Sequence, residues 1–237
     1  HGMFGGLSNF EAVLDLMPPE DYHLLVPKLP IFSCRQNINM VEMQSHWLKN
    51  LMQSLDIENA IIVGNSMGGH IALDFAYKYP TKVDKLILTG SSGLIENEMG
   101  STRPRRFDRS YIREQASKTF YENMVDDTMI DEISEVLQSS SKLRCIIKIA
   151  RDTKEYNMAS ILPKITHKTL LIWGKQDFIT PKYVAEKFQQ LLPNSRLHMI
   201  DQCGHAPMME RPVQFVDAMH NFINLDSNYA NQKQTIT

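Results

Sequence analysis

A short glycine-rich segment, Gly64-Asn65-Ser66-Met67-Gly68-Gly69, constrains the fold of this 237-residue chain more than any other feature. It lies between the apolar run 60–63 and a stretch of helical periodicity. A serine at a sharp turn from a strand into a helix needs small residues two positions before and after it, because the strained backbone packs closely there. Gly64 and Gly68 meet that need. The pattern predicts a nucleophilic Ser66 at the positive end of a helix; the alternative is a glycine-rich turn whose serine only caps the helix.

The rest of the chain alternates short apolar runs with longer helical stretches, which is typical of βαβ units. We expect five strands, at 22–26, 60–63, 83–88, 169–173 and 196–200. Apolar stripes at helical spacing run through 37–55, 71–79, 184–192 and 213–223. The predicted fold class is therefore α/β, with a mostly parallel central sheet flanked by helices.

One region interrupts this alternation. Residues 94–160 are helical in pattern, charged, rich in Met and Tyr, and contain no convincing strand. We interpret them as a helical cap inserted into a discontinuous core formed by residues 1–93 and 161–225. Residues 226–237 are polar and lack periodicity, so we expect a disordered tail there.

A serine hydroxyl needs a base to become a nucleophile at neutral pH, and the base needs an orienting carboxylate. Asp177 follows the run 169–173 and His205 follows the run 196–200. Each residue therefore lies just past the carboxyl end of a predicted strand, the edge where open α/β sheets build their sites. The order Ser, Asp, His is the one expected of a serine at such a turn. The sequence predicts Ser66 as nucleophile, His205 as base and Asp177 as the orienting acid.

Other acids and histidines fit these roles less well. Asp201 is an alternative acid, but it lies only four residues before His205, near the same strand end. Asp84 lies at the start of a predicted strand and thus at the wrong edge of the sheet. Three further histidines lie in helical patterns or directly after the glycine-rich turn, and we interpret them as surface or packed residues: His46, His70 and His220.

Stabilising a tetrahedral intermediate takes two converging N–H groups. Met67, the residue after the predicted nucleophile, supplies the first. By its position in the opening segment His1-Gly2-Met3, Met3 supplies the second. The alternative is a glycine-rich turn without a chemical role.

These segments, together with Gly174-Lys175-Gln176-Asp177 and Cys203-Gly204-His205-Ala206-Pro207, resemble the motifs of the α/β-hydrolase fold superfamily. The resemblance extends over nearly the whole chain, to about Leu225. It implies a nucleophile at Ser66, an acid at Asp177, a base at His205, oxyanion N–H groups at Met3 and Met67, and chemistry that needs no cofactor.

Within the superfamily, the Asn-Ser-Met turn is similar to that of the meta-cleavage product hydrolases, which split carbon–carbon bonds in vinylogous diketones. Those enzymes usually carry a tryptophan after the catalytic histidine and a Gly-Pro-Gly segment after the first His-Gly. This chain instead has Ala206-Pro207 and Phe4-Gly5-Gly6 at these places. That pattern is more similar to the carboxylesterase and lactonase-like members.

Charge and cysteine content bear on partners and compartment. Lys plus Arg number 25 against 27 Asp plus Glu, so nothing points to nucleic acid or an anionic membrane, and a small-molecule partner is expected. Cys34, Cys145 and Cys203 are widely spaced and form neither a CxxC pair nor an even set, which favours a reducing, cytoplasmic compartment. The histidines lack the spacing of metal ligands, so no metal site is expected.

The sequence thus predicts a serine hydrolase that cleaves a carboxylic ester of a small, largely apolar substrate through an acyl-enzyme. The alternatives are a carbon–carbon bond hydrolase of the meta-cleavage product type and a catalytically inactive binding protein of the same fold. In this superfamily a buried strand, and usually two more, precede the His-Gly element. We therefore expect the chain to lack its N-terminal strands and residues 1–237 alone not to form an independently stable protein.

Overall fold

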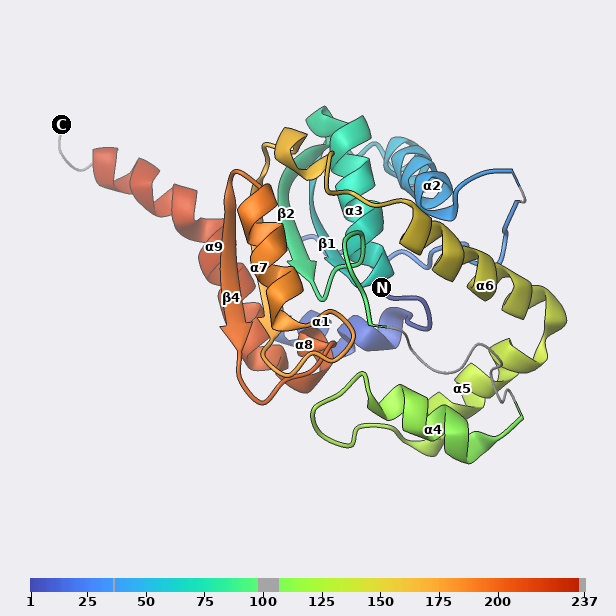
Figure 1. The fold of residues 1–237 in the computed structure, drawn as a ribbon. Coiled ribbons are helices and arrows are strands. Elements are labelled where there is room, and N and C mark those ends of the chain that lie inside the picture. The colour runs from blue at the N-terminus through green and yellow to red at the C-terminus, as the bar shows by residue number, and fades with distance from the viewer. Residues whose placement is uncertain (36, 98–106, 235–237) are drawn as a thin grey trace.

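A parallel sheet lies at the centre of the protein (Figure 1). The computed structural model describes residues 1–35, 37–97 and 107–234, with only the backbone described for 225–234. In these residues four strands pair in the order β1 (Ala60–Asn65), β2 (Val83–Thr89), β3 (Lys168–Gly174) and β4 (Ser195–Ile200). Four of the five expected strands are therefore present, each over nearly the predicted residues.

The parallel register brings the strand ends that matter for the site to one edge. Asn65 pairs with Thr89 across β1 and β2, and Gly174 pairs with Ile200 across β3 and β4. The segments that carry the predicted nucleophile, acid and base follow β1, β3 and β4. They consequently leave the sheet along the same edge, as the rule for open α/β sheets requires.

Helices cover both faces of the sheet. The described helices are α1 (Glu11–Leu16), α2 (Met40–Ser54), α3 (Met67–Lys78), α4 (Arg109–Ser117), α5 (Asp127–Gln138), α6 (Ser140–Glu155), α7 (Lys182–Leu191), α8 (Pro207–Glu210) and α9 (Pro212–Gln234), with 3-10 turns at Leu7–Phe10, Pro80–Lys82 and Leu162–Lys164. Leu86 and Leu88 of β2 pack on one face with residues of α3 and α7. Ile87, which points to the opposite face, packs with α1 and α9. Coverage on both sides explains why β2 and β3 carry nearly continuous apolar runs, whereas residues of β4 alternate between exposed and more buried positions.

Three of these helices, α4, α5 and α6, come between β2 and β3, where the sequence predicts helices without a strand. In Figure 1, α4 and α5 lie beyond the carboxyl ends of the strands. The third helix, α6, packs against α2, and the Met40 N–H at the start of α2 donates to Asp152 Oδ2 at 2.8 Å. This contact ties the inserted helices to the sheet-flanking layer.

Two of the three cysteines are bonded to each other, although their spacing and odd number favour a reducing compartment. Cys34 and Cys145 form a disulfide that joins the segment before α2 to α6. The two residues are 111 positions apart, so only the packing of α6 brings them together. Cys203 is a free, buried thiol, and burial raises its pKa.

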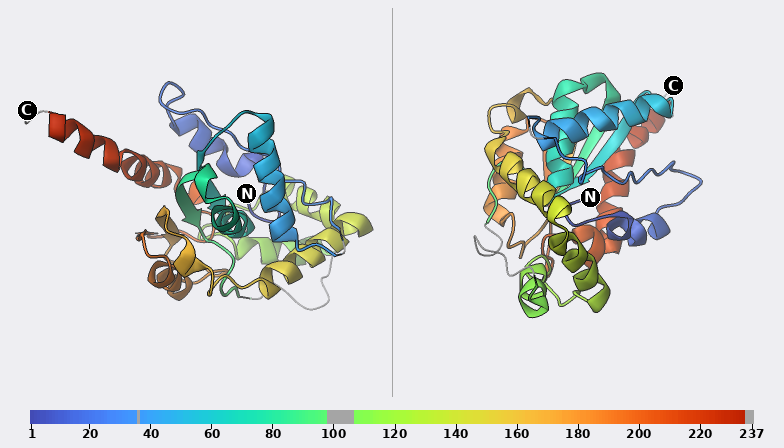
Figure 2. Two further views of the ribbon diagram at one scale, coloured as in Figure 1. Left: turned by 90° about the horizontal axis from the view of Figure 1, so that it is seen from above. Right: turned by 90° about the vertical axis from the view of Figure 1, so that its right-hand side faces the viewer.

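Two further expectations differ from the structure. Residues 22–26 form no strand: Leu24 and Leu25 are exposed, and Pro27, which lacks a backbone N–H group, follows directly, with Pro30 three residues later. The expected tail is helical as far as Gln234, because 226–234 contain neither proline nor glycine to end α9, whereas 235–237 lie outside the described residues. Figures 1 and 2 show this end of α9 extending away from the other elements.

In the described part of the chain, no helix has both the length and the apolar character that crossing a membrane requires.

Candidate active site

The glycine-rich segment forms a tight turn between β1 and α3. Ser66 lies at its apex with φ +54° and ψ −120°, a left-handed φ that is unusual outside glycine. A Cβ on Gly64 would lie 2.5 Å from the Gly68 carbonyl oxygen, and a Cβ on Gly68 would lie 2.9 Å from that of His1. Both positions therefore require glycine, as the sequence pattern predicts, and the turn leaves the Ser66 side chain only half-buried at the start of α3.

Asp177 and His205 meet although they are 28 residues apart. His205 Nδ1 lies 2.9 Å from Asp177 Oδ2, and both residues are buried. Because a carboxylate can only accept, we assign the imidazole proton to Nδ1, which leaves Nε2 unprotonated. That tautomer is the one a general base requires.

Further hydrogen bonds fix the orientation of the Asp177 carboxylate. Oδ1 accepts from the backbone N–H groups of Ile179 and Thr180 at 2.8 and 2.9 Å, and Oδ2 accepts from the Thr180 hydroxyl at 2.8 Å. Each oxygen is thus held by two donors, counting His205. Sequence reasoning missed Thr180, although an Asp that bonds the backbone two and three residues later is a recognisable turn pattern.

The loop that carries His205, residues 201–206, is called the base loop below. It lies against the serine turn, since the Asn65 side-chain amide donates to the His205 carbonyl at 3.1 Å. Gly90 also lies against the imidazole, because a Cβ there would be 2.7 Å from His205 Nδ1. Among the described residues no hydrogen bond joins the Ser66 hydroxyl to His205, and such bonds often form only when substrate is present.

The opening segment packs directly on the serine turn. A Cβ on Gly2 would lie 3.5 Å from Ser66 Cβ and 3.3 Å from Asn65 Oδ1. The segment His1-Gly2-Met3 is therefore beside the predicted nucleophile, as the sequence leads one to expect of an oxyanion element. The side chains of Met3 and Met67 join an apolar cluster that includes Ile146 of α6.

The competing residues lie elsewhere. Asp201 is exposed, and the Gln176 side-chain amide, at 3.1 Å, holds the pKa of its carboxyl below the usual range. Asp84 is exposed at the opposite end of the sheet and pairs with Lys85. The remaining histidines have other surroundings: His46 contacts Tyr79, His220 contacts Tyr22, and His70 is buried in α3 against Tyr156. In the described ranges, no group of three or more His, Cys, Asp or Glu side chains is placed to hold a metal ion.

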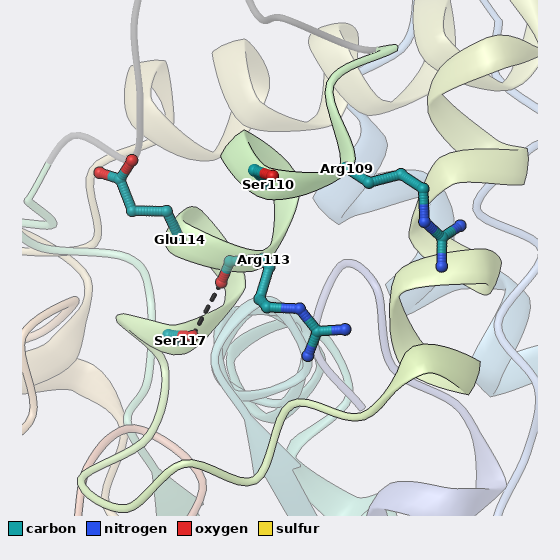
Figure 3. Close-up of a pocket in the computed structure, with 5 residues that line it drawn as sticks. All are labelled: Arg109, Ser110, Arg113, Glu114 and Ser117. Atoms are coloured by element: carbon teal, nitrogen blue, oxygen red, sulfur yellow. Dashed lines mark hydrogen bonds between the residues drawn. The ribbon is translucent and has the colours of Figure 1, made fainter.

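A separate pocket lies on α4 and is lined by Arg109, Ser110, Arg113, Glu114 and Ser117 (Figure 3). The Arg113 guanidinium is already engaged, because it donates to Val125 O and Asp127 Oδ1, both at 2.5 Å. The Ser117 hydroxyl donates back to Arg113 O within the helix. None of the predicted site residues lines this pocket, so we interpret it as local helix packing.

Comparison with protein families matches residues 3–218 to the alpha/beta hydrolase family. The chain belongs to this family. An alpha/beta hydrolase enzyme from the metagenome of lagoon sediments at Mar Chica, Morocco, is 36% identical, with a TM-score of 0.77 and a match over 96% of this chain and 89% of that one. The predicted α/β-hydrolase fold is confirmed, and the protein is a hydrolase of this type.

Relatives of two kinds match at lower identity. A 2-hydroxy-6-oxo-6-phenylhexa-2,4-dienoate hydrolase of Burkholderia cepacia is 28% identical over 89% of this chain and 80% of its own length. Lipase 3 of Moraxella sp. (strain TA144) is 25% identical over 89% of this chain and 71% of its own length. The proteins similar to this chain thus include both a dienoate hydrolase and a lipase.

Proposed function

We propose that this protein is a serine hydrolase that cleaves a carboxylic ester of a small, largely apolar substrate through an acyl-enzyme. The observation that carries the proposal is the buried 2.9 Å contact between His205 Nδ1 and Asp177 Oδ2, next to a serine held at positive φ. A nucleophile, an oriented base and a fixed carboxylate are the parts that a Ser-His-Asp triad requires.

In the first half-reaction the Ser66 oxygen forms a bond to the ester carbonyl carbon while His205 Nε2 takes the hydroxyl proton. Asp177 holds the imidazole in the required tautomer and stabilises the imidazolium. The N–H groups of Met3 and Met67 are proposed to receive the oxyanion. When the intermediate collapses, the alcohol leaves with the proton from His205. Water then attacks the acyl-enzyme with the same base, which releases the acid and restores Ser66.

Ester cleavage is preferred because of the residue after the base. Ala206 is buried there, at 2% exposure, where the meta-cleavage product hydrolases usually carry tryptophan. The second candidate is carbon–carbon cleavage, which the dienoate hydrolase relative favours. A substrate panel can separate the two, since both reactions would use the same triad.

Residues 94–97 and 107–160, the described part of the predicted cap, are proposed to enclose the substrate, while residues 98–106 lie outside the described residues. Ile146 and Ile149 of α6 share an apolar cluster with Met67, next to the proposed nucleophile. An apolar wall of this kind suits an apolar acyl or alcohol group and excludes water from the reacting centre.

The proposal is tested with a panel of p-nitrophenyl esters, lactones and dienones on the wild type and Ser66→Ala, with Ser54→Ala as a control at an exposed serine on α2. We expect ester turnover that Ser66→Ala abolishes and Ser54→Ala leaves unchanged. A serine-directed phosphonate should label Ser66. Near wild-type turnover by Ser66→Ala would refute the triad, and a tenfold or greater preference for dienones would favour the second candidate.

A further inference from the structure

The carboxylate of Glu210, at the end of α8, is buried at 6% exposure and belongs to none of the proposed catalytic groups. Oε1 accepts from the N–H groups of Gly204 at 2.9 Å and Ala206 at 3.4 Å. These two residues flank His205 in the base loop. The carboxylate therefore holds the main chain on both sides of the proposed base.

The other oxygen reaches a different part of the chain. Oε2 accepts from the Tyr121 N–H at 2.7 Å, in the loop that follows α4. The His205 N–H in turn donates to the Thr119 carbonyl of that loop at 2.7 Å. The base loop and the loop after α4 are thus joined directly, by the hydrogen bond from His205 to Thr119, and indirectly, through the carboxylate of Glu210.

The two loops pack so closely at Gly204 that no side chain fits there. A Cβ there would lie 2.7 Å from the Thr119 carbonyl oxygen and 2.9 Å from the Tyr121 nitrogen. Backbone at this distance cannot move aside without breaking the hydrogen bonds around it. The position of His205 is consequently coupled to that of the loop after α4.

Only a carboxylate satisfies all three N–H donors. An ionised carboxylate accepts at both oxygens, and bonds from N–H groups to an ionised acceptor are among the stronger ones in proteins. A glutamine at 210 would turn one oxygen into an NH₂ group, which would face an N–H donor. That arrangement leaves buried donors unpaired on one side or the other.

We propose that Glu210 is a positioning residue that sets the orientation of His205 and couples the base to the inserted helices. The proposal rests on the proposed function, because it assigns Glu210 an effect on the step in which His205 takes the Ser66 proton. A displacement of about 1 Å at a reacting group can cost about 10²-fold in rate, so that loss is expected in kcat when the carboxylate is replaced.

The test compares Glu210→Gln and Glu210→Asp with a matched control, Glu122→Gln. Glu122 lies next to Tyr121, and its exposed carboxylate pairs with the half-buried Arg211 guanidinium, so its substitution removes a nearby charge without touching the base loop. Steady-state kinetics on a p-nitrophenyl ester are normalised to the sites titrated by a phosphonate. We expect Glu210→Gln to lower kcat about 10²-fold with KM little changed, Glu210→Asp to restore part of kcat, and the control to match the wild type.

A second measurement does not depend on turnover. Amide hydrogen exchange should accelerate at Gly204 and Tyr121 in Glu210→Gln but not in the control. If Glu210→Gln fails to fold, the shorter Glu210→Asp carries the same kinetic and exchange tests. A folded Glu210→Gln with wild-type kcat per titrated site and unchanged exchange at both amides would overturn the proposal. A wild type without ester turnover would count against the proposed function instead, and the exchange result would still decide the contacts of Glu210.

Discussion

Replacing Asp177 with asparagine should move the imidazole proton of His205, the proposed base, from Nδ1 to Nε2 while leaving the shape of the site intact. Asparagine keeps one oxygen, and that oxygen can still accept from the Ile179 and Thr180 N–H groups, at the 2.8 and 2.9 Å positions of Oδ1. The new NH₂ group then takes the place of Oδ2 and faces His205 Nδ1. An NH₂ group can only donate, so Nδ1 must accept and the imidazole proton moves to Nε2.

The alternative amide orientation is less stable. Flipping the asparagine would return an oxygen to His205 but would direct the NH₂ group at two backbone donors. Each unpaired buried donor costs about 1–3 kcal/mol. The tautomer with the proton on Nε2 is therefore favoured. In that tautomer Nε2 cannot accept the Ser66 proton. The expected loss in kcat is about 10⁴-fold, equivalent to about 5 kcal/mol of transition-state stabilisation.

The assay is p-nitrophenyl ester hydrolysis by the wild type, Asp177→Asn and the control Asp84→Asn, each normalised to sites titrated with a phosphonate. Asp84 is exposed at the opposite end of the sheet, so its replacement should leave kcat unchanged. Thermal unfolding monitors the fold, which the isosteric change should preserve. A loss smaller than tenfold in folded Asp177→Asn, or an equal loss in Asp84→Asn, would show that Asp177 does not orient the base.

Two further predictions concern stability. Reduction of the Cys34–Cys145 disulfide opens a cross-link of sequence separation 111. Loop entropy predicts that the free energy of unfolding then falls by about 5 kcal/mol. Urea unfolding with and without a thiol reductant measures this change, and coincident unfolding midpoints would contradict the prediction. Burial lowers the pKa of His70 to about 4, below its ordinary 6.5, so the unfolded chain binds the proton more readily and stability is lost as pH falls from about 6.5 to 4, by up to about 3 kcal/mol. His70→Gln should reduce the loss of unfolding free energy over this pH range. An unchanged loss in that variant would show that groups other than His70 cause it.

Two of the four strands that the sequence identifies, β2 and β3, show which features can be predicted locally. The runs within β2 and β3 are buried on both faces, so almost every position must be apolar, and the chain carries that requirement locally. The serine turn is likewise local, because Gly64 and Gly68 are needed where backbone meets backbone. Features of this kind can be predicted from neighbouring residues alone.

The errors share the opposite property. Residues 22–26 have an apolar pattern suitable for a strand, but a strand exists only where another offers its edge, and no local pattern reports that. The Cys34–Cys145 pair depends on α6 packing beside α2, which spacing in the sequence does not reveal. Prediction therefore fails where the decisive partner is distant along the chain.

The same distinction separates the site residues that the sequence identifies from those it misses. Ser66, Asp177 and His205 are predicted from the sequence because their side-chain types suit the proposed chemistry and because they follow strand ends. Glu210, by contrast, acts on main-chain N–H groups, and any sequence supplies such donors, so the residues it contacts leave no signature of the interaction. A carboxylate that looks like an ordinary helix-end residue in the sequence is buried between the base loop and the inserted helices in the structure. Rate losses at such positions should accordingly appear in kcat, through the orientation of His205, without any change in the residues that touch the substrate.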